Sequence, residues 1–299
     1  FSGNKGFHIT GNNWHCVSND IGDPLVGSSN ILYDADNPTL FYFNATGNCK
    51  FDSNAVRNVD CFNTDLSQNK MMRAICNSGN ISCVQNYVLG INTTSSYSQT
   101  EANSNAGASL IGMEFEGTGT FNIHNNFVYN LTASNTTTLN PISVIGMQLD
   151  VKGKVHSNEI FRLRNQGIAS LNLPYIIGMN VFGSNDTLYN NRIALTNKPH
   201  TNNINIFGIR KQSNATQLIA YHNTVYIGGS SSSGKSYDLY KHNNVNQTFD
   251  NTRNNIFYNE RTGGGMNCAL GNSNLNANNW GVCDYNNLYA SNANTLCEW

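Results

Sequence analysis

This sequence has little charge, little proline and no long apolar run. Charged residues make up 12% of the 299 residues and the formal net charge is -1, which excludes a broad attraction to nucleic acid or to acidic membranes. No stretch approaches the roughly 18 apolar residues of a spanning helix, so we expect no membrane insertion. The opening FSGNKGFHIT lacks the charged and hydrophobic regions of a signal peptide. We therefore expect a segment of a larger secreted protein.

The cysteines lack the pattern of a metal site, because none forms a CxxC pair and the histidines do not cluster near them. An even number of cysteines in a polar chain favours disulfides and an oxidising, extracellular compartment. Buried free thiols in a cytoplasmic protein are the alternative. The candidate disulfide residues are Cys16, Cys49, Cys61, Cys76, Cys83, Cys268, Cys283 and Cys297.

Asparagine is abundant, beside 26 glycines and only five prolines. Asparagine, glycine, serine and threonine are poor in helix interiors, so this mixture favours short strands joined by polar turns. One asparagine motif recurs as IHNNFVYN, VHSNEIFR, LYNNRIAL, AYHNTVYI, TRNNIFYN and DYNNLYAS. The fourth residues of the six copies are Asn126, Asn158, Asn191, Asn223, Asn255 and Asn287. They recur about every 32 residues, and such regularity is typical of a repeat architecture.

A second motif recurs out of phase, with an apolar pair, a glycine and an alternating tail. It occurs as LIGMEFEG, VIGMQLDV, IIGMNVFG and IFGIRKQS, and YDLYKHNN continues it in degraded form. Each repeat supplies at least two short strands, too few to bury a face alone. We therefore predict an all-β fold, a right-handed parallel β-helix (solenoid) with about 32 residues per coil. Its inward column holds Met113, Phe115, Met147, Leu149, Met179 and Val181.

In such a stack equivalent side chains line up at the strand spacing of about 4.8 Å. One asparagine per coil, at a bend, can adopt a positive φ and bond its amide to the neighbouring coils. The asparagines at the fourth position are therefore predicted to form a structural ladder. Residues 1–299 are predicted to form a single domain, with irregular, insertion-rich coils over 1–105 and regular coils over 106–299.

These units resemble the right-handed parallel β-helix family, the pectate-lyase-like solenoids. The likeness is clearest in YHNTVYIGGSSSSGKSYDLYK, TRNNIFYNERTGGG and DYNNLYAS, and it covers residues 105–295. Such segments are similar to secreted or surface proteins of Bacteroidota-type bacteria, many of them exported by type IX secretion. The resemblance implies fold more than function, because polysaccharide lyases, hydrolases, adhesins and filament modules share this architecture.

One charged patch is the best candidate for chemistry. Lyases of this architecture need a cation to neutralise a uronate carboxylate and a base to take the α-proton. The candidate catalytic residues are Glu114, Glu116, Asp150, Lys152, Lys154 and Arg210. Carboxylates as close as Glu114, Glu116 and Asp150 either raise one another's pKa or share a cation such as calcium. A solvated charge ladder is the alternative interpretation, and no other cofactor is expected.

The cysteines fall into two groups, five before residue 84 and three after residue 267. At about 4.8 Å per coil the groups lie roughly 25–30 Å apart, too far for a disulfide. Odd numbers in both groups predict an unpaired cysteine in each. A free cysteine near an end is expected to join a neighbouring domain or subunit.

The sequence favours a non-catalytic extracellular or cell-surface β-solenoid, adhesin-like or structural. A polysaccharide lyase or hydrolase acting on an acidic polysaccharide is the main alternative, and a carbohydrate-binding module is another. The expected partners are carbohydrate or other surface proteins, and neighbouring domains or subunits of the same protein. A groove with long loops flanking a carboxylate or arginine cluster on one face would favour the enzyme, and a bare, flat face rimmed by short turns would favour the structural module.

Overall fold

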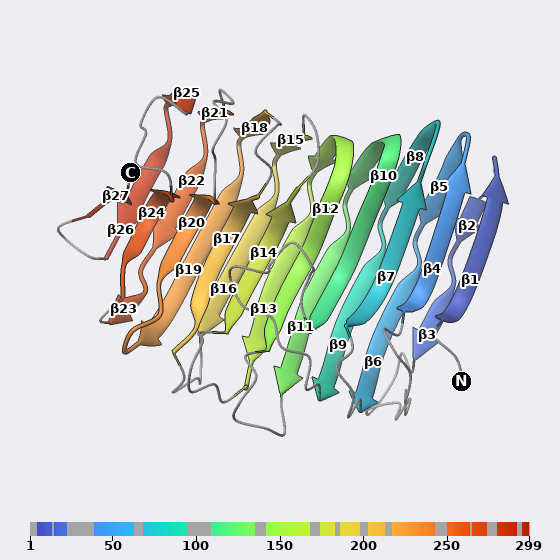
Figure 1. Ribbon diagram of the computed structural model, residues 1–299, viewed down its shortest axis with the longest axis horizontal. Coiled ribbons are helices and arrows are strands. Elements are labelled where there is room, and N and C mark those ends of the chain that lie inside the picture. Colours follow the sequence, from blue (N-terminus) through green and yellow to red (C-terminus); the bar gives the residue numbers. More distant parts are fainter. Residues whose placement is uncertain are drawn as a thin grey trace.

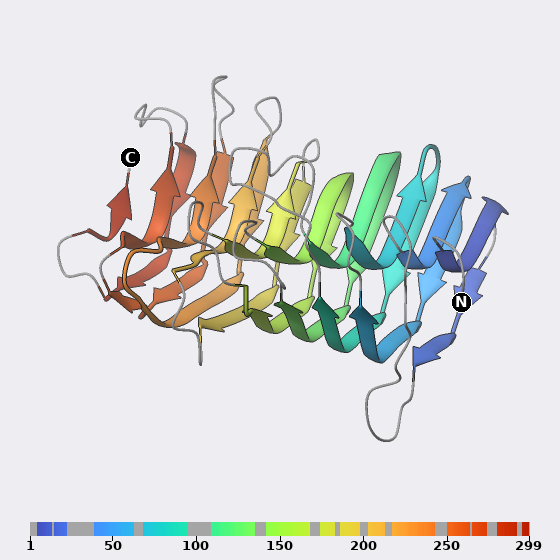
Figure 2. The same ribbon diagram turned by 60° about the horizontal axis from the view of Figure 1, so that its bottom comes forward.

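All strand pairings are parallel in the part of the chain that the structure describes. This computed structural model describes residues 5–13, 15–22, 39–62, 68–94, 109–134, 142–167, 174–182, 186–197, 203–212, 217–242, 250–263, 265–273, 280–291 and 295–298. The strands stack into a β-solenoid in which three faces, each made of parallel strands, surround an elongated core (Figures 1 and 2). None of the described segments forms a helix with the length and apolar character needed to cross a bilayer. The predicted all-β solenoid is confirmed.

Face 1 carries the glycine motif in four of its coils, at Gly112, Gly146, Gly178 and Gly208. Its strands are β1 (Lys5–Asn12), β4 (Thr39–Thr46), β7 (Asn69–Cys76), β14 (Tyr175–Val181), β17 (Asn205–Lys211), β20 (Ser236–Lys241), β24 (Asn267–Asn272) and β27 (Cys297–Glu298). Two longer strands, β10 (Leu110–His124) and β12 (Ser143–His156), contribute their first halves to face 1 and their second halves to face 2.

Face 2 follows face 1 in each coil and leads to the asparagine bend. Besides the second halves of β10 and β12 it contains β2 (His15–Val17), β5 (Cys49–Asp52), β8 (Asn80–Val84), β15 (Asp186–Tyr189), β18 (Leu218–Tyr221), β21 (Asp250–Arg253) and β25 (Trp280–Asp284).

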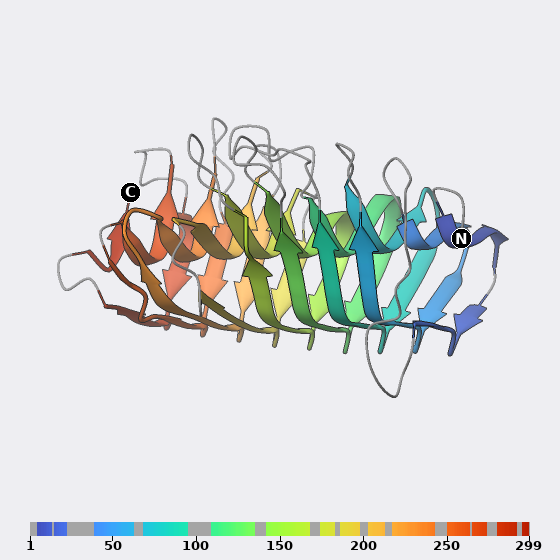
Figure 3. The ribbon, with the colours of Figure 1, turned by 90° about the horizontal axis from the view of Figure 1, so that it is seen from below.

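Face 3 follows the bend, and Figure 3 shows its strands side by side along the stack. They are β3 (Asp20–Gly22), β6 (Ala55–Phe62), β9 (Tyr87–Thr94), β11 (Phe127–Ser134), β13 (Glu159–Asn165), β16 (Arg192–Asn197), β19 (Thr224–Ser231), β22 (Ile256–Asn259) and β26 (Asn287–Ala290). A short strand, β23 (Thr262–Gly263), pairs with the end of β19.

A continuous ladder of asparagine side chains runs along the bend between faces 2 and 3. Its members are Asn19, Asn54, Asn86, Asn126, Asn158, Asn191, Asn223, Asn255 and Asn286. The predicted ladder is confirmed from Asn126 to Asn255 but is wrong in the last coil. There the interval shortens to 31 residues, so that Asn286 bonds to Asn255 and Asn287 begins β26 instead.

The left-handed residue of each bend is the one that precedes the ladder asparagine. Nine such residues have φ between 53° and 57°: Ser18, Ser53, Gln85, Asn125, Ser157, Asn190, His222, Asn254 and Tyr285. The expectation that the ladder asparagine itself adopts a positive φ is therefore wrong. The first residue of each pair adopts the left-handed backbone conformation of the bend, and the second supplies the carboxamide that forms the ladder hydrogen bonds.

The predicted inward column is confirmed, since all six of its residues are buried in the core. The glycine of the second motif allows faces 1 and 3 to approach closely. A Cβ atom on Gly146 would lie 2.7 Å from the Cγ2 of Ile160 on face 3 and 2.7 Å from the carbonyl oxygen of Gly178. In the later coil Asp238 takes the glycine's place and is fully buried.

The described strands of residues 5–94 continue the same three faces. Ladder members Asn19, Asn54 and Asn86 extend the ladder to the first coil. Their spacings of 35, 32 and then 40 residues are uneven, and this explains why the sequence predicts the early register poorly.

Candidate functional site: a groove on face 2

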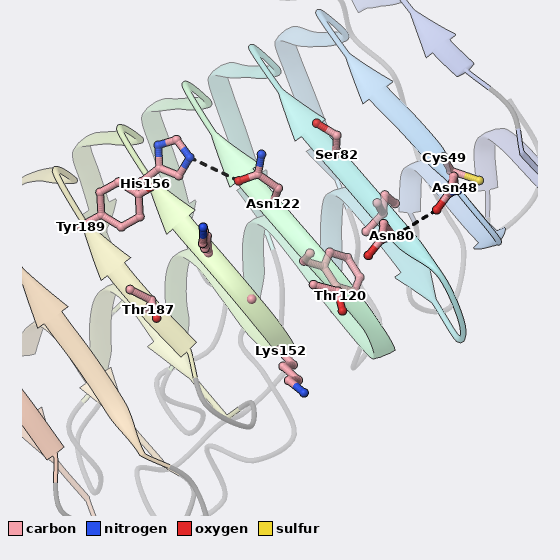
Figure 4. Close-up of a pocket in the computed structure, with 14 residues that line it drawn as sticks. Asn48, Cys49, Asn80, Ser82, Thr120, Asn122, Lys152, His156, Thr187 and Tyr189 are labelled. Atoms are coloured by element: carbon pink, nitrogen blue, oxygen red, sulfur yellow. Dashed lines mark hydrogen bonds between the residues drawn. The ribbon is translucent and has the colours of Figure 1, made fainter.

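A groove of about 840 Å³ lies on the outer surface of face 2 and crosses several coils (Figure 4). Its lining comes from β5, β8, β10, β12 and β15. The residues are Asn48, Cys49, Asn80, Ile81, Ser82, Thr120, Phe121, Asn122, Lys152, Gly153, Lys154, His156, Thr187 and Tyr189. Hydrogen-bonding side chains predominate, so the groove suits a polar ligand.

The strand register arranges these side chains in columns. One column runs through Asn80, Thr120 and Lys152, and a second through Ser82, Asn122, Lys154 and Thr187. Because neighbouring strands lie about 4.8 Å apart, each column offers a polar group at every coil. A long ligand aligned with the solenoid axis would therefore meet repeated hydrogen-bonding groups.

The alternation of side chains explains why these residues face outward. In β8, Ser82 points outward between Ile81 and Cys83, which are buried in the core. The turn before the strand contains Gly79, whose φ of 87° is unfavourable for other residues. At the start of β8, Asn80 donates its amide to the Oδ1 of Asn48 at 3.2 Å, which orders this end of the groove.

One edge of the groove is a stack of aromatic rings. The rings of His124 and His156 lie 4.7 Å apart at an interplanar angle of 4°. His156 and Tyr189 follow at 4.4 Å and 12°, and Tyr189 and Tyr221 at 5.1 Å and 3°. The ring faces contact one another, so a ligand meets mainly ring edges and hydroxyl groups. This geometry disfavours the flat stacking of sugar rings on these aromatic side chains.

Burial lowers the pKa of both histidines, so both imidazoles are neutral at pH 7. The Nε2 of His156 lies 3.3 Å from the Oδ1 of Asn122, a hydrogen bond that fixes the ring over the groove (Figure 4). Lys152 and Lys154 are both exposed, and the described lining contains no aspartate or glutamate. The groove is therefore polar and cationic.

The predicted carboxylates lie outside the groove, on the outer surface of face 1. Glu114 is fully buried between the Nζ of Lys70 at 2.7 Å and the Nε of Arg73 at 2.8 Å. A nitrogen of Arg73 also contacts Glu116 at 2.6 Å. Burial raises the pKa of Glu114, and Lys70 opposes that rise. These two carboxylates are held in ion pairs and are poorly placed to act on a substrate.

Of the remaining candidates, Asp150 lies beside these acids and the others lie apart from them. Asp150 is the register partner of Glu116 and is exposed, and partial burial and the charge of Glu116 raise its pKa. Arg210 is fully buried, with its guanidinium 5.0 Å from the ring centre of Phe207. Lys152 and Lys154 lie on face 2 and belong to the groove. The structure thus brings together the acids, and separately the lysines.

Among the described residues, no three or more histidine, cysteine, aspartate or glutamate side chains are placed to hold a metal ion. The calcium site suggested for Glu114, Glu116 and Asp150 stays a prediction. Any ion there would compete with Lys70 and Arg73 for the oxygens of Glu114.

The predicted disulfides are not seen, because all eight cysteines lie in the described ranges and carry free thiols. The strand register explains why two of these cysteines, Cys16 and Cys83, do not form a disulfide with each other. Cys16 and Cys83 share a column but are separated by Phe51, which places them about 9.6 Å apart, beyond disulfide reach. Burial raises the pKa of Cys16 to about 11 and that of Cys61 to about 12, so both thiols are protonated at neutral pH.

Sequence reasoning missed the N-terminal half of the groove and the cations that pair with the acids. A signal for the groove does exist in the segments GNCKFDSN (47–54) and GNISCVQN (79–86). Both begin with Gly-Asn and end with the ladder asparagine, which sets two further coils in register. Lys70 and Arg73 carry no comparable signal. Lys70 lies 44 residues before its partner Glu114, a separation that departs from the regular interval of the later coils.

Comparison of the chain with models of protein families, with curated proteins and with solved structures finds no match.

Proposed function

We propose that this chain is an extracellular, adhesin-like β-solenoid that binds an acidic carbohydrate in the face 2 groove without cleaving it. The main support for this proposal is the composition of the groove lining. It combines Lys152 and Lys154 with neutral hydrogen-bonding groups and has no aspartate or glutamate among its described residues. Ammonium groups attract carboxylate or sulfate groups of a glycan, while asparagine, serine and threonine side chains suit its hydroxyls.

The composition of the described groove lining supports binding over cleavage. Hydrolysis of a glycosidic bond generally uses two carboxyl groups flanking it. Glu114 and Glu116 are instead paired with Lys70 and Arg73 on face 1. The rival enzyme would have to use His156 or a lysine as its base, within the same groove.

The extracellular part of the proposal is supported by the resemblance of residues 105–295 to secreted pectate-lyase-like β-helix proteins of Bacteroidota-type bacteria. Low charge and a stack of polar turns are consistent with a surface module. A solenoid presents an extended surface for binding, and the groove runs across several coils of face 2.

Affinity electrophoresis tests the proposal. We expect polygalacturonate in the gel to retard the protein, and neutral dextran or DNA to leave its mobility unchanged. The variant Lys152→Ser/Lys154→Ser should lose the retardation. Arg192→Ser/Lys235→Ser removes two exposed positive charges elsewhere and serves as the matched control. Equal retardation of both double variants, or no retardation of the native chain, would refute binding in this groove.

A further inference from the structure

Three charged side chains of the C-terminal coils meet where face 1 leads into face 2. Lys211 and Lys241 end β17 and β20 and are register partners in neighbouring coils, and Asp250 begins β21 (Figure 1). The Nζ of Lys211 lies 2.6 Å from the Oδ1 of Asp250, and the Nζ of Lys241 lies 2.7 Å from its Oδ2. One carboxylate therefore lies between two amino groups.

This cluster is withdrawn from water. The exposed fractions of the side chains are 2% for Lys211, 0% for Lys241 and 1% for Asp250. The ring of Trp280, the register partner of Asp250, lies 4.6 Å from the Nζ of Lys241. Lys211 is also the register partner of Val181, which packs in the core. Charges at such a position keep a large desolvation penalty even when they are paired.

We infer that the Nζ of Lys211 and the Cγ of Asp250 become joined by an intramolecular amide (isopeptide) bond, with loss of one water molecule. The reaction replaces opposite charges by a neutral amide and so removes their desolvation penalty. Because the fold holds the amine against the carboxyl group, the reaction is effectively unimolecular. The exclusion of water also protects the amide from hydrolysis.

The contacts of the carboxylate assign a role to each of its oxygens. The Oδ1 of Asp250 accepts the backbone N–H of Leu218 at 2.8 Å as well as the Nζ of Lys211. A fixed backbone donor stabilises the charge that develops on this oxygen when the carbon is attacked, so Oδ1 remains as the amide oxygen. Oδ2 faces Lys241 and is the oxygen that leaves. Lys211 is therefore the nucleophile and Lys241 the proton carrier.

Both lysines suit these roles. Burial lowers the pKa of Lys211, and the charge of Asp250 opposes the shift, so a larger share of this amine is neutral and nucleophilic than in water. Burial also lowers the pKa of Lys241, which makes its ammonium group a better proton donor.

The reaction balances without a co-reactant. It starts from a neutral Lys211 amine, a Lys241 ammonium and an Asp250 carboxylate. Lys241 gives a proton to Oδ2, and the Nζ of Lys211 forms a bond to Cγ. Lys241 then takes a proton from the attacking nitrogen and passes it to Oδ2, so that the Cγ–Oδ2 bond breaks and water leaves. The products are an amide, water and a neutral Lys241 amine, and nothing is oxidised or reduced.

The ion pair of Lys70 with Glu114 lacks these conditions. The Lys70 side chain is 10% exposed, and the second cation at Glu114 is Arg73, which is 26% exposed. A guanidinium group does not give up its proton in proteins, so it cannot carry protons as an amine does. We therefore expect this pair to stay unlinked.

The amide would brace the stack covalently. It would join β17 of one coil to β21 of the next and close a loop between positions 39 residues apart. Such a closure restricts the unfolded chain in the same way as a disulfide. The eight cysteines carry free thiols, so the amide would supply a covalent tie that they do not.

Mass spectrometry of the reduced native chain tests the bond. We expect an intact mass below that of the sequence by one water molecule. Trypsin cleaves after Arg210, Lys235, Lys241 and Arg253, so the digest should contain residues 211–235 joined to residues 242–253. A mass equal to that of the sequence would overturn the proposal. A link through Lys241, which would lie within residues 236–253, would overturn the assignment of the nucleophile.

Two variants separate this bond from other losses of water. Lys211→Met keeps the contact of Lys241 with Asp250 and should have the mass of its sequence. Lys235→Met, at an exposed position, is the matched control and should still lose water. After boiling in detergent, the native chain should also migrate faster than Lys211→Met, because its denatured form contains a closed loop. A loss of water that persists in Lys211→Met, or equal migration of the two chains, would contradict the proposal.

Discussion

The side chains of Asn191 and Asn223 lie one coil apart and are joined by a hydrogen bond of 2.9 Å from Nδ2 to Oδ1. The same Oδ1 accepts the backbone N–H of Asn191 at 3.1 Å. The Nδ2 of Asn191 also donates to the carbonyl oxygen of Val155 in the preceding coil at 2.9 Å. Each internal ladder carboxamide thus uses both amide hydrogens and both oxygen lone pairs, and it ties three coils together.

Asn191→Ala should lower the free energy of unfolding by about 3 kcal/mol or more, because it leaves several buried groups unsatisfied at about 1–3 kcal/mol each. Urea denaturation measures the change. Asn287→Ala is the matched control, because Asn287 is exposed and lies outside the ladder. It should change stability by less than about 0.5 kcal/mol. Equal effects of the two variants would contradict the ladder.

The left-handed bend predicts a pair of opposite effects at Gln85, which is exposed and has a φ of 53°. Gln85→Gly should stabilise the fold by about 0.5–1 kcal/mol, since glycine adopts this backbone without a steric penalty. Gln85→Val should destabilise it by at least about 1 kcal/mol, because a β-branched residue is poorly tolerated there. The urea midpoints of both variants give the answer, and a more stable valine variant would refute the assignment.

Asp186 gives the fold a pH dependence. Its side chain is buried at the start of β15, and burial raises its pKa to about 8, opposed by a hydrogen bond from the backbone of Gly153. The folded state then retains a proton that the unfolded state releases near pH 4, so stability should fall as the pH rises from about 4 to about 8. Above that range the contribution is constant.

Asp186→Asn should remove this dependence, because an amide of the same shape does not titrate. The variant and the native chain should have similar melting temperatures near pH 4, and the variant should melt higher near pH 8. Parallel melting curves over this range would show that Asp186 is ionised throughout in the folded state.

The ion pairs on face 1 predict a structural role for Glu114. Glu114→Gln leaves Lys70 and Arg73 facing a neutral amide and should cost about 3–5 kcal/mol of stability. Retardation by polygalacturonate should remain unchanged under conditions where the variant is folded, because Glu114 lies outside the groove. Asp150→Asn, at an exposed position, should change stability by less than about 0.5 kcal/mol. A stable Glu114→Gln variant that has lost binding would contradict this division.

The fold could be predicted because its repeat contains asparagine and glycine at positions where the backbone geometry requires them. The regular interval between asparagine motifs sets the coil length, and the glycine motif sets the approach of two faces. The slip from Asn287 to Asn286 was not predictable, because both members of that pair are asparagine. In this coil Tyr285 adopts the left-handed backbone conformation immediately before the ladder asparagine Asn286.

The site was harder to predict, because it depends on which side chains meet across coils. The sequence identifies Lys152 and Lys154 as a charged pair but groups them with acids that lie on another face. The bend between face 1 and face 2 inside β12 separates Asp150 from Lys152. The alternating pattern of the sequence runs through that bend without a break, so the change of face has no signal in it.

Binding without cleavage is tested most directly by recovering the polysaccharide itself. Polygalacturonate is incubated with saturating protein, with and without calcium, and its chain length and absorbance at about 235 nm are followed, the latter reporting the unsaturated product of an elimination. We predict polymer that is bound yet unchanged in length, with no rise in absorbance. Shortened chains or a rise in absorbance that depends on the protein would contradict it.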